Sequence, residues 1–312
     1  MRILILGARG MLGQALALEF SHTGHEVIGW DRADLDITDR ELVLEKINAL
    51  SPRVIINAAA YNNIDKAETE DGKLAFQINA EAVWRLAEAS ARVGALFAHY
   101  STDYVFHGDK VEGYSEADAP DPQSVYAKSK FEGEHRILSL RGENEVSDEA
   151  IPKQKHEIAS LPMVARNDGE ILKYYLIRTS RLFGTAGIGD GAKKGFVDVM
   201  LKLGREKKEL DLVDEEVSSP TYVVDLARAT RELIESGAPA GIYHRTNAGA
   251  CTWYEWAKKI FELSKLNVKL NPVLADKFPR PAPRPKFSKL LNTKLPFLRS
   301  WEEALAEYLV TL

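Results

Sequence analysis

The stretch Gly7-Ala8-Arg9-Gly10-Met11-Leu12-Gly13 decides the fold, because it follows a short apolar run at residues 3–6 and opens an amphipathic segment. Glycines at such spacing allow a tight turn, close approach of the backbone to a pyrophosphate and close packing of a helix on a strand. The N-terminus of that helix presents free N–H groups to the phosphates. The sequence therefore predicts a βα turn that binds a dinucleotide, with five residues against the cofactor: Gly7, Gly10, Met11, Leu12 and Gly13.

The rest of the chain repeats this alternation of strands and helices. Short apolar runs at 3–6, 26–30, 53–57, 96–101 and 174–179 predict buried parallel strands, and helical spacing predicts helices at 12–20, 40–50 and 74–93. The fold class is α/β, a Rossmann doubly wound parallel sheet with a smaller C-terminal α/β substrate-binding region. We expect an NAD(P)-binding domain at 1–180 and a mainly substrate-binding domain at 181–312.

Two further features belong to this division of the chain. Residues 141–170 interrupt the alternation of strands and helices and predict an atypical insertion, either a surface excursion or a flap over the active site. Beyond residue 182 the pattern loosens. Helices are expected at 196–204 and 223–235, and strands at 210–213 and 241–245, while Thr252 and Glu255 form a capping box for a helix through 264.

Composition narrows the class of protein. The 312 residues are 45% hydrophobic and 28% charged, as in ordinary globular proteins, with a formal net charge of -5. This charge argues against nucleic acid and anionic membrane as partners. A lone cysteine excludes an internal disulfide, and neither a signal peptide nor a membrane span is recognisable, so a cytoplasmic location is expected.

The end of the second expected strand bears on the choice of cofactor. Asp31 is placed to accept from the adenosine ribose hydroxyls, whereas Arg32 is suited to a 2′-phosphate. The two side chains favour opposite cofactors, so we expect NADPH or NADH with weak selectivity. Five more residues at the ends of later segments complete the expected cofactor site: Asp36, Ile37, Ala58, Ala59 and Ala60.

A catalytic constellation follows in the expected order along the chain. Tyr126 and Lys130 stand at i and i+4 of a helix and share one face. A phenol beside an ammonium can pass a proton near neutral pH. Thr102 leaves the expected strand at 96–101, where a hydroxyl can hydrogen-bond the reacting oxygen and polarise a carbonyl.

These motifs resemble the extended short-chain dehydrogenases, and among them the dTDP-4-dehydrorhamnose reductase family. The resemblance runs through GARGMLG, VIINAAAYNNIDKAE, HYSTDYVF, VYAKSKFEGE, LIRTSRLFG, SSPTYVVDLA, CTWYEWA and RPKFSKL, and so through most of the chain outside 141–170. It implies reduction of the C4 ketone of dTDP-4-dehydro-L-rhamnose to dTDP-L-rhamnose with NAD(P)H. It also implies that Thr102, Tyr126 and Lys130 are the catalytic triad.

The resemblance also indicates the substrate side of the cleft. The expected substrate-binding residues are Thr102, Asp103, Tyr104, Tyr126, Arg181 and Arg284, the last within a proline-rich basic run. Arg181 and Gly195 depart from the family, which commonly has Trp and Asn there. Gln14-Ala15 lacks the carboxylate with which some relatives bind a metal between subunits.

Two other functions stay open. A nucleotide-sugar epimerase would share the triad, whereas dehydratases have Glu where this chain has Tyr104. The chain also resembles the regulatory subunit of methionine adenosyltransferase, which binds NADP without catalysing a reaction. His22 and His25 lack further ligands nearby, so no metal is expected. A homodimer is left open.

Overall fold

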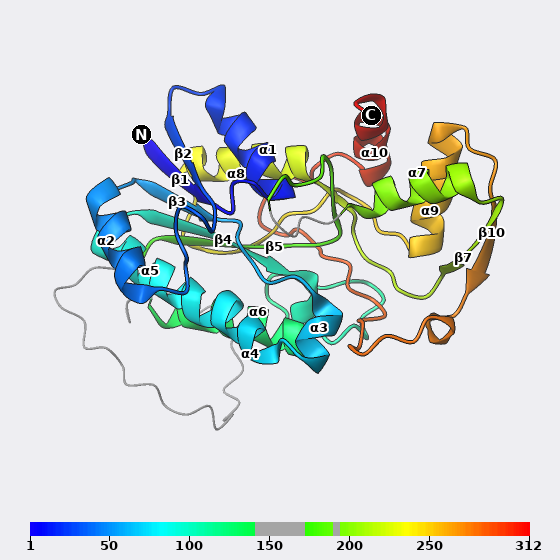
Figure 1. Cartoon of the computed structure of the whole chain (residues 1–312), viewed down its shortest axis with the longest axis horizontal. Coiled ribbons are helices and arrows are strands. Elements are labelled where there is room, and N and C mark those ends of the chain that lie inside the picture. The colour runs from blue at the N-terminus through cyan, green and yellow to red at the C-terminus, as the bar shows by residue number, and fades with distance from the viewer. Residues whose placement is uncertain (141–171, 190–193) are drawn as a thin grey trace.

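The computed structural model describes residues 1–140, 172–189 and 194–312. The insertion expected at 141–170 lies outside these residues. A six-stranded parallel sheet runs through the larger part of the molecule (Figure 1). Its order is β2-β1-β3-β4-β5-β9, with β1 Arg2–Leu6, β2 Glu26–Trp30, β3 Val54–Asn57, β4 Leu96–Thr102, β5 Tyr174–Thr179 and β9 Gly241–His244. The predicted doubly wound sheet is confirmed.

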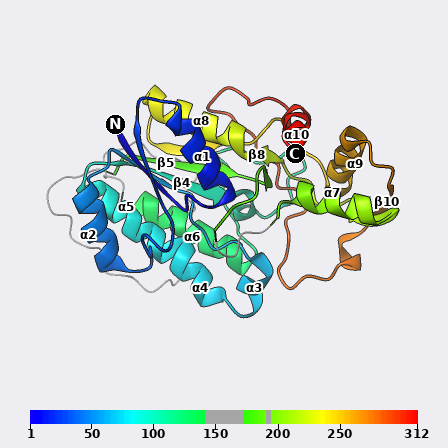
Figure 2. The ribbon, with the colours of Figure 1, turned by 45° about the horizontal axis from the view of Figure 1, so that its top comes forward.

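Helices cover both faces of this sheet, which is why its strands are mostly apolar (Figures 1 and 2). Ile3 and Ile5 of β1 pack with α1 (Met11–Ser21) and α8 (Val223–Ser236). Leu4 and Leu6 point the other way, to the core under α2 (Arg40–Leu50), α5 (Ala82–Arg92) and α6 (Val125–Ser139). Two separate apolar layers therefore hold β1 in place, and with it the turn that follows at Gly7.

The helix expected at 74–93 is not regular. Two short helices, α3 (Ile64–Thr69) and α4 (Gly72–Phe76), lead into a π-helical turn, η1 (Gln77–Glu81), and then α5. The π-turn follows from packing, because α6 approaches so closely that a Cβ at Gly133 would lie 2.2 Å from the Asn79 carbonyl oxygen. The Asn79 side chain bonds to the backbone of Tyr61 and to Ser129 of α6.

A smaller region lies beyond the carboxyl ends of the main strands (Figure 1). It contains α7 (Phe196–Glu206), α9 (Trp253–Ser264), α10 (Trp301–Val310) and two parallel strand pairs. The pairs are β7 (Glu209–Val213) with β10 (Lys269–Val273), and β6 (Leu182–Phe183) with β8 (Thr221–Tyr222). The capping box of Thr252 and Glu255 is present at α9, as expected. No pattern in the sequence predicted α3, α10 or the strands β6, β8 and β10.

The chain crosses between the two regions more than once. After residue 181, α8 and β9 return to the large sheet, so a division at residue 180 is not a single cut. Two short 3-10 turns, η2 (Asp103–Val105) and η3 (Ala275–Lys277), lie in segments between the regular elements. Among the described residues, no helix has the length and apolar character needed to cross a membrane.

Candidate active site

The glycine turn lies where the strand order reverses, between β1 and β3. Gly7 has a φ of +73°, and a Cβ there would lie 2.8 Å from the Ala59 nitrogen. A Cβ at Gly13 would lie only 2.0 Å from the Gly7 carbonyl oxygen. The first turn of α1 has neither a side-chain cap nor an acidic residue, so no side chain of the protein neutralises the positive end of this helix, and residues 187–189 lie against Arg9 and Met11. This turn fits a pyrophosphate, and Gly10, Met11 and Leu12 are its remaining members.

Three alanines from the end of β3 border the turn. The Ala58 nitrogen donates to the carbonyl oxygen of Leu6, and the Ala59 nitrogen donates to Oδ1 of Asn57 at 3.1 Å. Ala58 and Ala59 are half-buried and Ala60 is exposed. The backbone of Ala58 and Ala59 lies so close to Gly7 that a side chain at that position would not fit.

The charged residues after β2 differ in how far their side chains are already held by local hydrogen bonds. Asp31 Oδ1 accepts from the Arg32 nitrogen at 2.7 Å, and the Arg32 side chain is 87% exposed. Asp36 is different, because its Oδ1 accepts from both the nitrogen and the hydroxyl of Thr38. These hydrogen bonds from Thr38 lower the pKa of Asp36 and commit its carboxylate to a local turn, while Ile37 is buried. Asp31 and Arg32 therefore remain the pair able to reach a ribose.

Thr102 and Asp103 stand at the carboxyl end of β4. The Thr102 hydroxyl donates to Asp103 Oδ1 at 3.1 Å and accepts from the Tyr104 nitrogen at 3.2 Å. Asp103 is 2% exposed, and its Oδ2 accepts from the hydroxyls of three serines: Ser180 at 2.9 Å, Ser218 at 2.8 Å and Ser288 at 2.6 Å. Asp103 was expected to contact substrate, but this carboxylate is already surrounded by the protein's own hydroxyls.

Tyr126 and Lys130 project from α6, which begins after the Ser124 cap. The ring of Tyr126 meets that of Tyr104 edge-on, with centroids 6.0 Å apart. Burial raises the pKa of Tyr126 to about 12. A hydrogen bond with Thr102 opposes this rise, and the carboxylate of Asp103 adds to it. Burial and Asp103 likewise raise the pKa of Tyr104. Tyr126 is therefore held as the neutral phenol, the form needed by a proton donor.

The side chain of Lys130 is more deeply buried than that of Tyr126, one turn earlier on α6. Its Nζ donates to the Tyr100 carbonyl at 2.7 Å and lies 3.3 Å from His99 Nε2. Burial lowers the pKa of Lys130 to about 8, although Glu134 one turn further along opposes the change. Glu134 is itself buried in an ion pair with Arg178, at 2.7 Å. The ammonium is thus poised to lose or gain its proton near neutral pH.

His99 connects this lysine to the cofactor side of the sheet. Its Nδ1 lies 3.1 Å from Nδ2 of Asn57, whose Oδ1 is already used by Ala59. The amide orientation makes Nδ1 an acceptor, so a neutral ring carries its proton on Nε2, toward Lys130. Burial and Lys130 both lower the pKa of His99, which keeps the ring neutral.

The two expected substrate arginines are held by neighbours, Arg181 within the smaller region and Arg284 by a residue of α3. Arg181, with a φ of +41°, donates to the carbonyls of Cys251 and Glu216 and stacks 4.0 Å above the ring of Trp253. Arg284 donates to Asp65 Oδ2 of α3 at 2.9 Å, and its side chain is 10% exposed. Glu216 additionally pairs with Arg280 and accepts from Trp253 Nε1 at 2.9 Å.

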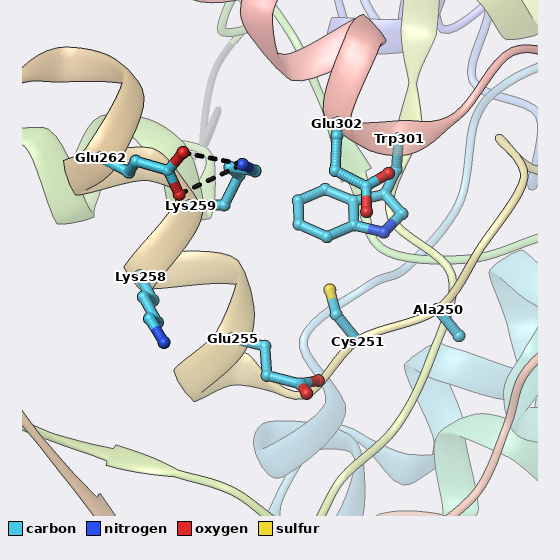
Figure 3. A pocket seen from close by; sticks show the side chains of 8 residues that line it. All are labelled: Ala250, Cys251, Glu255, Lys258, Lys259, Glu262, Trp301 and Glu302. Carbon is cyan, nitrogen blue, oxygen red and sulfur yellow. Dashed lines mark hydrogen bonds and ion pairs between the residues drawn. The ribbon is translucent and has the colours of Figure 1, made fainter.

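Two hollows lie near these groups. One of about 280 Å³ is lined by Glu216, Ala275, Asp276, Phe278, Pro279, Arg280, Ala282 and Arg284. Another, of about 230 Å³, lies between α9 and the start of α10 and contains the Lys259–Glu262 ion pair (Figure 3). Burial raises the pKa of Cys251 in this second hollow to about 12, so its thiol is not ionised at neutral pH. None of the expected catalytic side chains lines either hollow.

Pattern analysis missed several of these residues. His99, Asn57, Glu134 and Arg178 are buried polar groups inside apolar strands and a helix, which is itself a signal of function or of a fixed partner. Ser180, Ser218, Ser288 and Asp65 carry no comparable signal, because their partner is distant in sequence. Within the described ranges no cluster of three or more His, Cys, Asp or Glu residues could hold a metal.

Comparison with known proteins places the chain in a family. The sequence model described as "RmlD substrate binding domain" matches residues 1–146 and 163–312. The spore coat polysaccharide biosynthesis protein SpsK of Bacillus subtilis (strain 168) is 34% identical over 312 residues, covering 99% of this chain and 96% of that protein.

Two solved structures are similar along the whole chain. A dTDP-4-dehydrorhamnose reductase from Clostridium acetobutylicum ATCC 824 has a TM-score of 0.84 at 37% identity, and that of Bacillus anthracis str. Ames, in complex with NADP, has 0.85 at 34%. Each comparison covers 100% of this chain and 99% of the other. The chain therefore belongs to the RmlD substrate binding domain family, that of the dTDP-4-dehydrorhamnose reductases, which are NAD(P)-dependent oxidoreductases of the extended short-chain type.

Proposed function

We propose that this chain reduces dTDP-4-dehydro-L-rhamnose to dTDP-L-rhamnose, using NADPH or NADH. The enzyme is an NAD(P)-dependent oxidoreductase acting on a nucleotide sugar, and the specific sugar and nucleotide are the proposed part. One observation carries the proposal: Thr102 at the end of β4 and the Tyr126–Lys130 face of α6 lie at the carboxyl edge of the sheet, where β1 leads into the glycine turn. The expected division of labour, with cofactor on the sheet and substrate mainly on residues 181–312, is part of the same proposal.

The chain's own residues divide the work. Gly7, Gly10 and Gly13 with the N-terminus of α1 would hold the pyrophosphate, and Asp31 or Arg32 the adenosine ribose. Lys130 would hold the second ribose. The bound nicotinamide supplies hydride to the carbonyl carbon.

Proton delivery falls to Tyr126. Its phenol is neutral at physiological pH because burial raises the pKa to about 12, so the proton is present when the substrate oxygen becomes basic. Thr102 orients this donor. Arg181 and Arg284 are the proposed contacts to the diphosphate, and the planar guanidinium suits such a group.

Purified protein mixed with NADPH and dTDP-4-dehydro-L-rhamnose tests the proposal. Loss of the reduced-nicotinamide absorbance, with a product two hydrogens heavier by mass spectrometry, is the expected result. The same sugar on UDP and a dTDP-linked 4-keto sugar of other stereochemistry should react more slowly. Interconversion of sugars without net oxidation of NADPH would indicate an epimerase. Tight binding of NADP with no turnover of any keto-sugar would indicate a regulatory protein.

A further inference from the structure

The surroundings of Asp103 determine which way the neighbouring hydroxyls point. Ser180 follows β5, Ser218 precedes β8 and Ser288 lies in the C-terminal segment, yet all three hydroxyls contact the same oxygen, Oδ2. Each hydroxyl has one proton to donate. Ser180 and Ser218 also contact one another, so at least two of the three protons still point at Oδ2. Oδ2 therefore carries no proton of its own. Burial raises the pKa of Asp103, whereas the hydrogen bonds from the three serines and the positive charge of Arg181 lower it and favour the carboxylate form.

The other oxygen of Asp103 faces Thr102. Oδ1 accepts the Thr102 hydroxyl at 3.1 Å, and Arg181 adds a positive charge nearby. A carboxylate has acceptor atoms but no proton to donate, so the single proton of the Thr102 hydroxyl is directed to Oδ1. One lone pair of Thr102 takes the Tyr104 N–H at 3.2 Å. Tyr126 also contacts this hydroxyl, and the contact opposes the rise of the Tyr126 pKa. Because the Thr102 proton is directed to Asp103, the lone pair that remains is the one that Thr102 can offer to the neutral phenol.

We propose that Asp103 is a positioning residue that fixes Thr102 as a hydrogen-bond acceptor, in a chain running from the Tyr126 hydroxyl to Thr102 and from Thr102 to the Asp103 carboxylate. Thr102 then holds the Tyr126 proton in place until the substrate oxygen takes it, instead of polarising the ketone by donation. The three serines come from both regions of the molecule, so the same carboxylate ties the substrate-binding segments to the proton donor. This inference rests on the proposed reductase function.

Asp103→Asn is the decisive substitution, because it keeps the shape and changes the hydrogen-bonding. An amide must turn its oxygen to the serine hydroxyls, and its N–H2 group then donates to Thr102. Thr102 is forced to turn its own proton toward Tyr126, which reverses the chain. We expect kcat to fall about 10- to 100-fold, with a much smaller change in KM, because removing a hydrogen bond to a charged group costs about 1.5–3 kcal/mol.

A double-mutant cycle separates this role from a structural one. In a Thr102→Val background, Asp103→Asn should have little further effect on kcat, because no hydroxyl remains to be reoriented. Asp225→Asn is the matched control. Asp225 is another buried carboxylate with several partners, bonded to Asn247 and Arg299 away from Thr102. It should alter the melting temperature and leave kcat within about twofold in either background.

An infrared measurement tests the same inference without turnover. The difference spectrum of wild type minus Asp103→Asn at neutral pH should show a carboxylate band from Asp103. A band of a protonated carboxylic acid would overturn the inference, because a protonated Asp103 could donate to Thr102. Equal kcat losses with and without the Thr102 hydroxyl would overturn it as well. If wild type reduces no keto-sugar at all, the proposed function fails while the infrared result still decides the state of Asp103.

Discussion

The large sheet and the smaller C-terminal region hold their functional side chains by different means. On the sheet, Gly7, Asn57 and Thr102 come at strand ends, and Tyr126 and Lys130 come from one helix face. Backbone geometry places these groups. In the smaller region, arginines are held by contacts between distant segments, as Arg181 is by the carbonyls of Cys251 and Glu216.

This difference teaches where chemistry and substrate choice reside. Groups at strand ends stay in place as long as the sheet folds, so the reaction type is built into the fold. Two of the arginines each pair with one carboxylate, Arg284 with Asp65 and Arg280 with Glu216. Replacing one partner can redirect an arginine without disturbing the sheet. We therefore expect substitutions on the sheet to change turnover or stability strongly and those in the smaller region to change KM modestly.

The largest effect should come from the proton donor. Tyr126→Phe should lower kcat about 10²- to 10⁴-fold, the usual contribution of a positioned general acid. The dissociation constant for NADP, measured by fluorescence quenching, should stay unchanged. Tyr104→Phe, on the ring that meets Tyr126 edge-on, is the matched control and should lose far less. Near wild-type turnover in Tyr126→Phe would remove this phenol from the mechanism.

The next largest effect concerns the ion pair behind the catalytic helix. Arg178 and Glu134 are 2% and 0% exposed, so Arg178→Met leaves a carboxylate buried without its cation. The free energy of unfolding should fall by about 3–5 kcal/mol, as seen by urea denaturation. Lys259→Met in α9 of the smaller region is the comparison. Lys259 and its partner Glu262 are 30% and 61% exposed, so the loss should be smaller, about 1 kcal/mol or less. Similar losses in both variants would contradict the contrast between the regions.

The sequence predicts most strands of the sheet, but it does not predict which distant residues hold the buried charged side chains. The alternation of apolar runs and amphipathic segments predicted five of the six strands of the main sheet within one residue at either end, because a doubly covered strand must be apolar throughout. A strand was expected at 241–245, but the sequence of so short a strand does not show which sheet it joins. Its place next to β5 in the main sheet was therefore not predicted. The π-turn at Asn79 was missed because it depends on Gly133 in a helix far along the chain.

The candidate site divides in the same way. Motif spacing brought Thr102, Tyr126 and Lys130 to one edge of the sheet, because parallel strands end together and residues four apart share a helix face. No local pattern relates Asp103 to Ser180, Ser218 and Ser288, which are up to 185 residues away. Such contacts arise only from tertiary packing, so Asp103 was expected to face substrate although it is enclosed.

Cofactor preference should change about tenfold. Asp31→Ala removes the carboxylate placed for the ribose hydroxyls and leaves Arg32, so the kcat/KM ratio of NADPH to NADH should rise. Asp39→Ala is the matched control, because the Asp39 carboxylate caps α2 by accepting from the Leu42 nitrogen, whereas Asp36 lies 4.0 Å from Arg32 itself. The ratio should stay close to that of the wild type in this variant. A wild-type preference for NADH above about a thousandfold would exclude a role for Arg32.

The buried lysine makes stability depend on pH. Burial lowers the pKa of Lys130 from 10.5 to about 8, so between these values the unfolded chain binds more protons than the folded protein. Stability contributed through Lys130 should therefore rise with pH above about 8, by at most about 1.4 kcal/mol per pH unit. Buried tyrosines with raised pKa values act in the opposite sense above about pH 10. The urea midpoint of unfolding can be measured for wild type and Lys130→Met at several pH values between roughly 7.5 and 9.5. The two curves of midpoint against pH should converge or cross, and parallel curves would contradict the lowered pKa of Lys130.

The smallest effect should come from the substrate side, at Arg284. Its Nη2 donates to Asp65 at 2.9 Å and its Nη1 to the Ala282 carbonyl at 3.0 Å, so part of its hydrogen-bonding capacity is already used. Arg284→Ala should raise the KM for the sugar nucleotide about three- to tenfold and leave that for NADPH nearly unchanged, because a charge-assisted contact shared with Asp65 contributes only about 1 kcal/mol. Asp65→Asn is the matched variant, since it frees the guanidinium without removing it, and it should leave KM equal or lower it. The measurements belong at low salt, where such contacts are strongest. Equal KM values for wild type and Arg284→Ala would mean that this proline-rich segment only crosses the surface, and that the diphosphate is bound elsewhere in the smaller region.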